Sequence, residues 1–231
     1  MEKLFSFLIN FIDKNYHQKK IFSFLNRLNI QIIFDIGAHK GEFLRSIKKL
    51  KKVNKIYSFE PQKKVFDNLN LLNKGNKVEC FNVAISENKG TKKLKINKKT
   101  STSTFSKINS NSKWYKIKSL LISGNLKNSF IGNENVKTTT LDYFCNKNKI
   151  QKIDLLKIDT EGHEEQVLIG AANMIAKKKI KYILIEFHLS KMYQNYNVKN
   201  LENLLNKSNL KLLKKFKFPL LSFEDRIYKL I

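Results

Sequence analysis

The chain has 231 residues, of which 42% are hydrophobic, and it carries a formal net charge of +26. This length and apolar content suit one α/β domain, and only two prolines leave no obvious linker to a second one. The two cysteines lack CxxC or Cys/His spacing, which argues against a disulfide framework and a zinc site. We therefore predict a reducing, cytoplasmic location.

Lysine dominates the charge, with 45 Lys and Arg residues against 19 Asp and Glu. Such an excess favours an anionic partner: nucleic acid, an acidic glycan or a membrane surface. The lysines are spread along the whole chain among Asn and Ile, which is typical of a compositional bias rather than a built patch. Nucleic acid is therefore not the favoured partner.

Residues 1–30 are predicted to form an N-terminal helical extension ahead of a domain over 31–231. Apolar residues recur there at helical spacing: Leu4, Phe5, Leu8, Phe11 and Ile12. This run is too short to span a bilayer, and no basic n-region or cleavage site indicates a signal peptide. A helix packed on the domain is the favoured interpretation, and a basic amphipathic helix lying on a membrane is the alternative.

From residue 30 onward, short strand-like runs alternate with helical stretches. The strand-like runs are "IQIIFDIG", "NKIYSFE", "KVECFNVAIS", "KIDLLKID" and "IKYILIEFH", and the helical stretches cover 42–50, 61–73, 140–148 and 163–176. This alternation predicts a mostly parallel sheet with helices on both faces. The ending "LKLLKKFKFPLLSFEDRIYKLI" has two strand-like runs without a helix between them, which predicts a C-terminal antiparallel hairpin.

Residues 97–133 interrupt this alternation with a stretch rich in Ser, Asn and Lys. Its length is large for a structureless loop in a compact domain, and such loops are usually lids, binding loops or disordered segments. The hydroxyl-rich run "STSTFS" at 101–106 is its most distinctive part. Two interpretations stay open: a solvated polar loop, or an insertion that covers a substrate as a lid.

The stretch "FDIGAHKG" places Asp35 at the end of the first strand, with Gly37 and Gly41 in the turn that follows. Ligands of open parallel sheets bind beyond the carboxyl ends of the strands, and glycine lets the backbone approach them closely. The spacing D-x-G-x-x-x-G is not the dinucleotide fingerprint G-x-G-x-x-G. An acid at the strand tip repels a pyrophosphate but suits a ligand that carries an ammonium or sulfonium group.

The second strand ends in another acid, Glu60 of "YSFEP", and Pro61 begins the next helix. An acid at this place accepts hydrogen bonds from ribose hydroxyls in nucleoside-cofactor sites. The two acid-ended strands together predict a ligand with a ribose, an adenine-like end and a cationic amino-acid end. S-adenosylmethionine fits all three requirements.

The run "LLKIDTEGHEEQVLIGA" at 155–171 joins a buried strand to an amphipathic helix. Asp159 and Glu161 flank the strand end, and the two acids at 164–165 lie in the first helical turn, where we favour helix capping as their role. The next strand ends in "LIEFH", which adds Glu186 and His188. Because parallel strands end side by side, we expect Asp159, Glu161, Glu186 and His188 to converge at one edge.

Six stretches resemble, in order, the FkbM family of S-adenosylmethionine-dependent methyltransferases, which have a Rossmann-like class I fold. They are "FDIGAHKGEF", "YSFEP", "NVAIS", "VKTTTLDYF", "LLKIDTEGHEEQVLIGA" and "ILIEFH", within roughly residues 31–190. The resemblance implies a seven-stranded sheet of order 3-2-1-4-5-7-6. It also implies O-methylation of hydroxyls on sugars, polysaccharides or polyketide-like small molecules.

By motif match, the residues that would hold S-adenosylmethionine come from the first two acid-ended strands and from the end of the third. They are Asp35, Gly37, Gly41, Glu60 with its neighbour Pro61, and Asn82 to Ala84 on the adenine side. His39 stands where many relatives carry Asn and is a further candidate for a hydrogen bond to the cofactor.

An alcohol that accepts a methyl group must also lose its proton. His188 is the natural base because imidazole titrates near neutral pH, and Asp159 is an alternative. Carboxylates such as Asp159 and Glu186 would otherwise hold Mg²⁺ or Mn²⁺ to acidify the hydroxyl. We favour the metal-free version, because no local D-x-D-like oxygen cage is present.

Two rival functions share the cofactor half of this prediction. An RNA methyltransferase would suit the charge, but amino-methylating enzymes of that kind usually carry Asn/Asp-Pro-Pro-aromatic where this chain has "DTEGHE". A non-catalytic S-adenosylmethionine-binding protein would not need the acids and His188. An NAD-dependent enzyme is the least supported, because G-x-G-x-x-G is absent.

Overall fold

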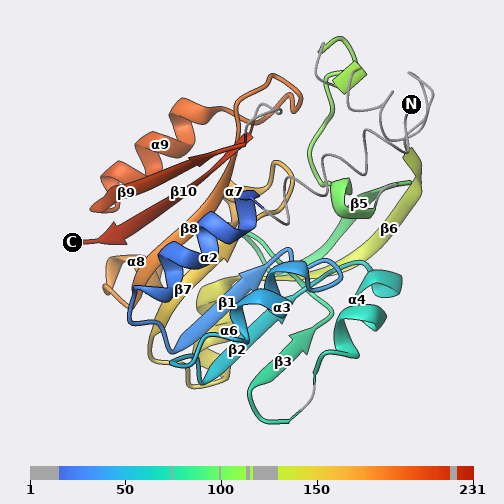
Figure 1. Cartoon of the computed structure of the whole chain (residues 1–231). Coiled ribbons are helices and arrows are strands. Elements are labelled where there is room, and N and C mark those ends of the chain that lie inside the picture. Colours follow the sequence, from blue (N-terminus) through green and yellow to red (C-terminus); the bar gives the residue numbers. More distant parts are fainter. Residues whose placement is uncertain (1–15, 74, 99, 113–114, 117–129, 219–222) are drawn as a thin grey trace.

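A seven-stranded sheet forms the centre of the computed structural model, which describes residues 16–73, 75–98, 100–112, 115–116, 130–218 and 223–231 (Figure 1). The strand order is β3-β2-β1-β7-β8-β10-β9, and β9 and β10 are antiparallel to their neighbours. This order confirms the predicted Rossmann-like fold with its C-terminal hairpin. The strands are β1 (Ile32–Ile36), β2 (Lys55–Phe59), β3 (Val78–Phe81), β7 (Ile153–Ile158), β8 (Ile180–His188), β9 (Leu210–Lys217) and β10 (Phe223–Leu230).

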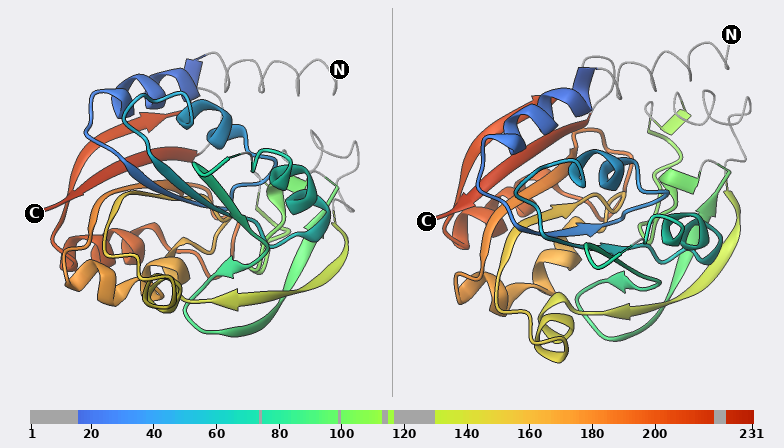
Figure 2. Two further views of the ribbon diagram at one scale, coloured as in Figure 1. Left: turned by 90° about the horizontal axis from the view of Figure 1, so that it is seen from below. Right: turned by 60° about the horizontal axis from the view of Figure 1, so that its bottom comes forward.

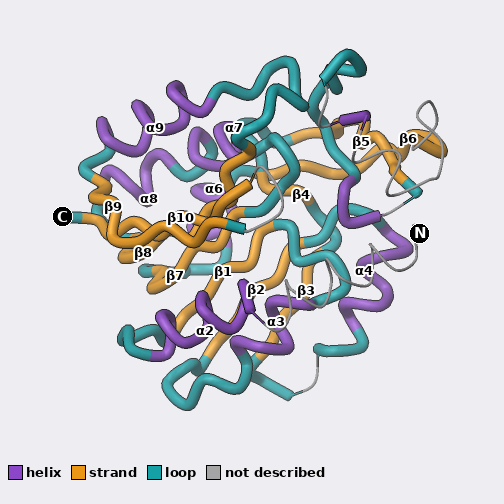
Figure 3. The backbone as a smooth tube through the Cα atoms, turned by 45° about the horizontal axis from the view of Figure 1, so that its top comes forward, coloured by secondary structure: helices purple, strands orange, loops and turns teal. Residues whose placement is uncertain are grey.

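Helices cover both faces of this sheet (Figure 3). One face carries α2 (Gln18–Asn26), α3 (Glu42–Ile47) and α4 (Lys63–Asn70). The other carries α6 (Leu141–Lys147), α7 (Glu164–Ile169), α8 (Ala172–Ala176) and α9 (Val198–Lys207). Two buried layers explain why β1, β7 and β8 read as nearly continuous apolar runs.

A second sheet lies beside the first, and the sequence patterns did not predict it (Figure 2). It has the order β4-β6-β5, formed by β4 (Ala84–Ile85), β5 (Gly90–Asn97) and β6 (Phe130–Thr139). The run "KVECFNVAIS", predicted as one strand, is therefore divided between β3 and β4. The division falls at Asn82, whose side-chain amide donates to the carbonyls of Glu60 and Pro61 at 3.0 and 2.9 Å and holds the chain over the end of β2.

The predicted insertion 97–133 connects the two long strands of this second sheet. It begins at the last residue of β5, passes through a 3₁₀ turn at Thr100–Thr102 and ends inside β6. Positions 99, 113–114 and 117–129 lie outside the described residues. Residues 100–112 cross the carboxyl edge of the main sheet, so the hydroxyl-rich run is not a free solvated loop.

Two helical features differ from the sequence expectation. The stretch 163–176 is two helices that meet at Gly170, where a Cβ atom would collide with the carbonyl of Ser86. Helix α9 had no predicted counterpart. Helix α2 packs on the core through Ile21 and Leu25, whereas residues 1–15, with Leu4, Phe5, Leu8, Phe11 and Ile12, lie outside the described residues.

The division of the chain at residue 30 stays a prediction. Among the described residues, no helix combines the length and the apolar character needed to cross a membrane.

Candidate active site

The turn after β1 requires both of its glycines. Gly37 and Gly41 have φ values of +78° and +82°, in the left-handed region that favours glycine. A Cβ atom at Gly37 would collide with the backbone carbonyl of Asp159, and one at Gly41 with the side chain of Leu72. Gly37 therefore lets the ends of β1 and β7 touch.

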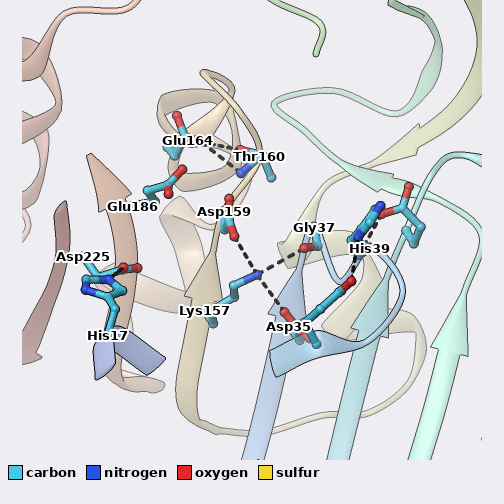
Figure 4. A network of polar contacts seen from close by, with 12 residues as sticks. His17, Asp35, Gly37, His39, Lys157, Asp159, Thr160, Glu164, Glu186 and Asp225 are labelled. Atoms are coloured by element: carbon cyan, nitrogen blue, oxygen red, sulfur yellow. Dashed lines mark hydrogen bonds and ion pairs between the residues drawn. The ribbon is translucent and has the colours of Figure 1, made fainter. Parts of the chain in front are cut away.

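An ion triad, largely buried, lies next to this turn (Figure 4). Asp35 of β1 pairs in register with Lys157 of β7, whose Nζ lies 3.1 Å from Asp35 Oδ1, 3.3 Å from Asp159 Oδ2 and 3.1 Å from the Gly37 carbonyl. Burial raises the pKa of Asp35, and Lys157 opposes that rise. Burial alone would lower the pKa of Lys157, but Asp159 and Asp35 outweigh it and raise that pKa.

Glu60 is the second buried acid of the β1–β2 edge, by which we mean the carboxyl ends of these two strands. Its Oε2 accepts from the His39 N–H at 3.0 Å, and its Oε1 accepts from the Gln62 N–H at 2.9 Å. Each oxygen keeps a second lone pair for a ligand. Burial raises the pKa of Glu60 to about 7.

The polar groups at the β1–β2 edge are chemically suited to the predicted cofactor. No well-directed hydrogen bond from the described residues reaches either carboxylate oxygen of Asp35, which leaves only its ion pair with Lys157. A cationic amino-acid end would suit this acid, and ribose hydroxyls would suit Glu60. Ala84 belongs to β4 in the second sheet, so the Asn82–Ala84 segment passes from one sheet to the other beside Pro61.

The β7–β8 edge, the carboxyl ends of β7 and β8, is organised by Glu164. Its Oε1 accepts from the Thr160 N–H, the Thr160 hydroxyl and the Gly162 N–H at 2.9, 3.0 and 3.1 Å. His188 Nε2 lies 3.8 Å from the same oxygen and 3.3 Å from Glu186 Oε2. Burial alone would raise the pKa of Glu164, but His188 and the backbone donors hold that pKa below its ordinary value.

The four predicted catalytic side chains do not form one cluster. Glu186 and His188 meet, as expected, whereas Asp159 faces Lys157. Glu161 has a left-handed backbone, with φ +54°, and its carboxylate accepts from the hydroxyl of the buried Tyr193. Burial, reinforced by the charge of Glu161, raises the pKa of Tyr193 well above its ordinary value.

A strap, residues 100–109, links the two edges. At the β1–β2 edge, the Thr100 hydroxyl lies 2.7 Å from His39 Nε2, and the Thr100 carbonyl accepts from the Gln62 amide. At the β7–β8 edge, the hydroxyls of Thr104 and Ser106 donate to the carbonyls of Glu161 and Gly162 at 2.5 and 2.6 Å. Two hydroxyls of the run "STSTFS" therefore attach the strap to the β7–β8 edge.

Sequence reasoning missed Lys157 as a site residue and assigned Glu164 to helix capping alone. A signal for Lys157 was present, because it stands two residues before Asp159 in "KID" and the strand period of two puts both on one face. The bonds of Tyr193 and the strap cross long stretches of sequence and had no local signal. Among the described residues, no group of three or more His, Cys, Asp or Glu side chains is arranged to hold a metal ion.

Comparisons with known proteins agree with the fold. The sequence model of the family described as "Methyltransferase FkbM domain" matches residues 35–216. The chain matches none of the curated proteins with which it was compared.

Two solved structures of the methyltransferase domain of bacterial CtHen1 are similar to the chain. The CtHen1-CN form has a TM-score of 0.53 at 9% identity, with 94% of this chain and 99% of that chain covered, and the CtHen1-C form has 0.52 at 9%, with 94% and 98% covered. A methyltransferase from Aquifex aeolicus, described as SAM-dependent, has a TM-score of 0.50 at 11%, with 100% and 99% covered. Such low identities show the fold alone.

Proposed function

The chain belongs to the FkbM methyltransferase domain family, and from this premise we propose that it methylates a hydroxyl group of a sugar, a glycan or a related small molecule. The family makes it a SAM-dependent methyltransferase, and the hydroxyl acceptor is the proposed part. The observation that carries this part is His188, buried between Glu186 and Glu164 at the β7–β8 edge and thus placed to take a proton.

The β1–β2 edge holds the cofactor in this proposal. Glu60 accepts the ribose hydroxyls, Asp35 and the Gly37–Gly41 turn receive the amino-acid end, and Asn82 to Ala84 line the adenine side. When bound, S-adenosylmethionine supplies a methyl group on a positively charged sulfur. The turn and Glu60 contribute by orienting it, and good orientation can supply ~7–11 kcal/mol of a barrier.

His188 takes the proton of the acceptor hydroxyl. Its Nε2 faces the carboxylates of Glu186 and Glu164 at 3.3 and 3.8 Å, and these charges stabilise the imidazolium that forms. A positioned base of this kind contributes about 10²–10⁴-fold. Glu164 also fixes the Thr160–Gly162 loop, so that the histidine and the loop keep one geometry.

In this proposal the strap covers the acceptor, whereas most of the predicted insertion beyond residue 112 lies outside the described residues. Support for this role comes from the bonds of the strap to both edges, which hold it across the carboxyl edge. A cover at this place excludes water from the transfer. The cytoplasmic location and a membrane contact through the N-terminal helix stay proposals.

A turnover screen with S-adenosylmethionine over sugar nucleotides and lipid-linked glycans tests the acceptor class. On the acceptor found, His188→Ala is expected to lower kcat by about a hundredfold or more while S-adenosylhomocysteine still binds. Activity should survive a chelator and rise with pH as the histidine loses its proton. Loss of activity with chelator, restored by Mg²⁺ or Mn²⁺, would instead support the metal mechanism.

RNA methylation is the second candidate, and the net charge of +26 is the observation that favours it. Binding to RNA that weakens steeply with salt, together with methyl incorporation into RNA, would establish it in place of the glycan proposal.

A further inference from the structure

Lys157 is a buried cation at the centre of the carboxyl edge, and the proposed methyl-transfer mechanism assigns it no role. Its side chain is 9% exposed, and its Nζ contacts Asp35, Asp159 and the Gly37 carbonyl at once (Figure 4). Burying an ammonium costs several kcal/mol unless opposite charges compensate it. For packing alone, the Asp35–Lys157 pair as a whole could be replaced by apolar side chains such as those of the neighbouring Leu156 and Ile158.

The charge of this triad follows from its members. Two carboxylates and one ammonium leave a single net negative charge next to the Gly37 turn. Asp159 is the member that reaches solvent, with 40% of its side chain exposed, whereas Asp35 is completely buried. Lys157 joins the two through one nitrogen and ties both to the turn.

We infer that Lys157 is a charge-balancing positioning residue: it cancels the charge of one of the two carboxylates next to the turn that would receive the cofactor's cationic end, and it fixes the other, Asp159, beside Gly37. This role rests on the proposed function only through the cofactor, and it holds for any methyl acceptor. It predicts that the charge of the triad sets how strongly the site prefers S-adenosylmethionine, with a positive sulfur, over S-adenosylhomocysteine, with a neutral one.

A reason for such a balance lies in the change of charge during the reaction. The positive charge on sulfur is present in the reactant and is lost on the way to the product. A carboxylate facing the sulfur therefore stabilises the reactant more than the transition state, and such binding does not raise kcat. One uncompensated carboxylate attracts the positively charged cofactor, and a second would bind the reactant too tightly. Lys157 cancels the charge of the second carboxylate.

Calorimetric dissociation constants for both cofactor forms, at about pH 7.5, test this role with three variants. Asp159→Asn removes a negative charge from a partly exposed position. The matched pair is D35N and D35N/K157M: without the carboxylate of Asp35, neither variant buries an acid that needs the lysine. The two therefore differ only by Lys157. Titration of Glu60 affects both ligands alike, because both contain the ribose.

The expected changes have opposite signs. Asp159→Asn should lower the preference for S-adenosylmethionine about threefold or more, and K157M in the D35N background should raise it by a similar factor, because unit charges at short range remain strong in a partly buried site. A role in folding alone would move both affinities together and leave their ratio unchanged. If D35N/K157M does not fold, D35N/K157Q keeps a donor for the Gly37 carbonyl and should shift the ratio in the same direction.

An unchanged ratio between D35N and its lysine-free partner would overturn the inference. In that case wild-type binding of both ligands would leave the proposed function standing. Failure of the wild type to bind either ligand would remove the cofactor assignment and this inference together.

Discussion

The β1–β2 edge and the β7–β8 edge carry similar acids but are built differently. At the first, Glu60 is held by the backbone N–H groups of Gln62 and His39, which lie 2 and 21 residues away. At the second, Glu161 is held by Tyr193, and its carbonyl by Thr104, which is 57 residues away. The β1–β2 edge is thus a compact motif, whereas the β7–β8 edge is assembled from distant segments.

This difference indicates where variation is tolerated. In the proposed function, a motif of strand end, turn and helix positions the common cofactor with few residues. The strap and the loop that contains Tyr193 are connecting segments at the edge where we propose that the acceptor binds, and such segments accommodate sequence change more readily than strands. The two edges meet at the Gly37–Asp159 contact and at Lys157.

Disrupting the Gly37–Asp159 contact, where the two edges meet, should have the largest effect on stability. Gly37→Ala adds a methyl group at φ +78° that collides with the Asp159 carbonyl. Because this carbonyl belongs to the backbone, it cannot move aside without distorting the chain. We expect a loss of about 4 kcal/mol or more in the free energy of unfolding, measured by denaturant titration. Gly132→Ala is the control, because nothing lies within 4 Å of its added Cβ. A stable Gly37→Ala protein that binds S-adenosylhomocysteine would show that the edges need no such contact.

The pH response of the β1–β2 edge should be carried by Glu60. Ribose hydroxyls donate to the ionised carboxylate, so affinity for S-adenosylhomocysteine should rise about tenfold from pH 6 to 8, around its pKa of about 7. Stability should change in the opposite direction. The folded pKa lies above the ordinary glutamate value of 4.5, so the stabilising contribution is complete below about 4.5 and is lost as pH rises through about 7.

The comparison with Glu60→Gln isolates this titration. Relative to the variant, the wild type should lose up to about 3 kcal/mol of unfolding free energy across that pH window. Calorimetry and denaturant titrations at several pH values measure the two effects. A pH profile that persists in Glu60→Gln would assign it to another group.

The β7–β8 edge should depend on Glu164 and not on its neighbour. Glu164→Ala leaves the buried N–H groups of Thr160 and Gly162 without their acceptor, which should cost about 2 kcal/mol of stability. Glu165→Ala, at a half-buried position in the same helical turn, should stay within about 0.5 kcal/mol of the wild type. Equal losses of stability in the two variants would indicate that Glu164 only caps the helix.

The smallest expected effect tests whether the strap belongs to the acceptor side. Ser106→Ala removes the hydroxyl that donates to the Gly162 carbonyl at 2.6 Å, which should cost about 1 kcal/mol. Its affinity for S-adenosylhomocysteine should equal that of the control Ser110→Ala, whose serine is exposed. A fall in cofactor affinity in the first variant alone would mean that the strap couples the two edges.

The fold could largely be predicted from the sequence, because its signals are local. Strand runs such as "IQIIFDIG" and "KIDLLKID" are apolar throughout, since both faces of the sheet are buried. The second sheet could not be predicted from the sequence, because β5 is a lysine-rich strand with little apolar alternation. The boundary between β3 and β4 depends on the side chain of Asn82 reaching two carbonyls, which no periodicity reveals.

For the site, the sequence by itself determined the acids and glycines next to each strand end, because parallel strands bring their carboxyl ends to one edge. It could place Asp35, Glu60, Asp159 and Glu186 at that edge without any contact being known. Only the tertiary structure decided their partners, since the bonds of a carboxylate depend on which donors packing brings within about 3 Å. Packing buried Lys157 between two acids: the spacing of two residues places it on one face with Asp159, but only the pairing of β1 with β7 brings it to Asp35.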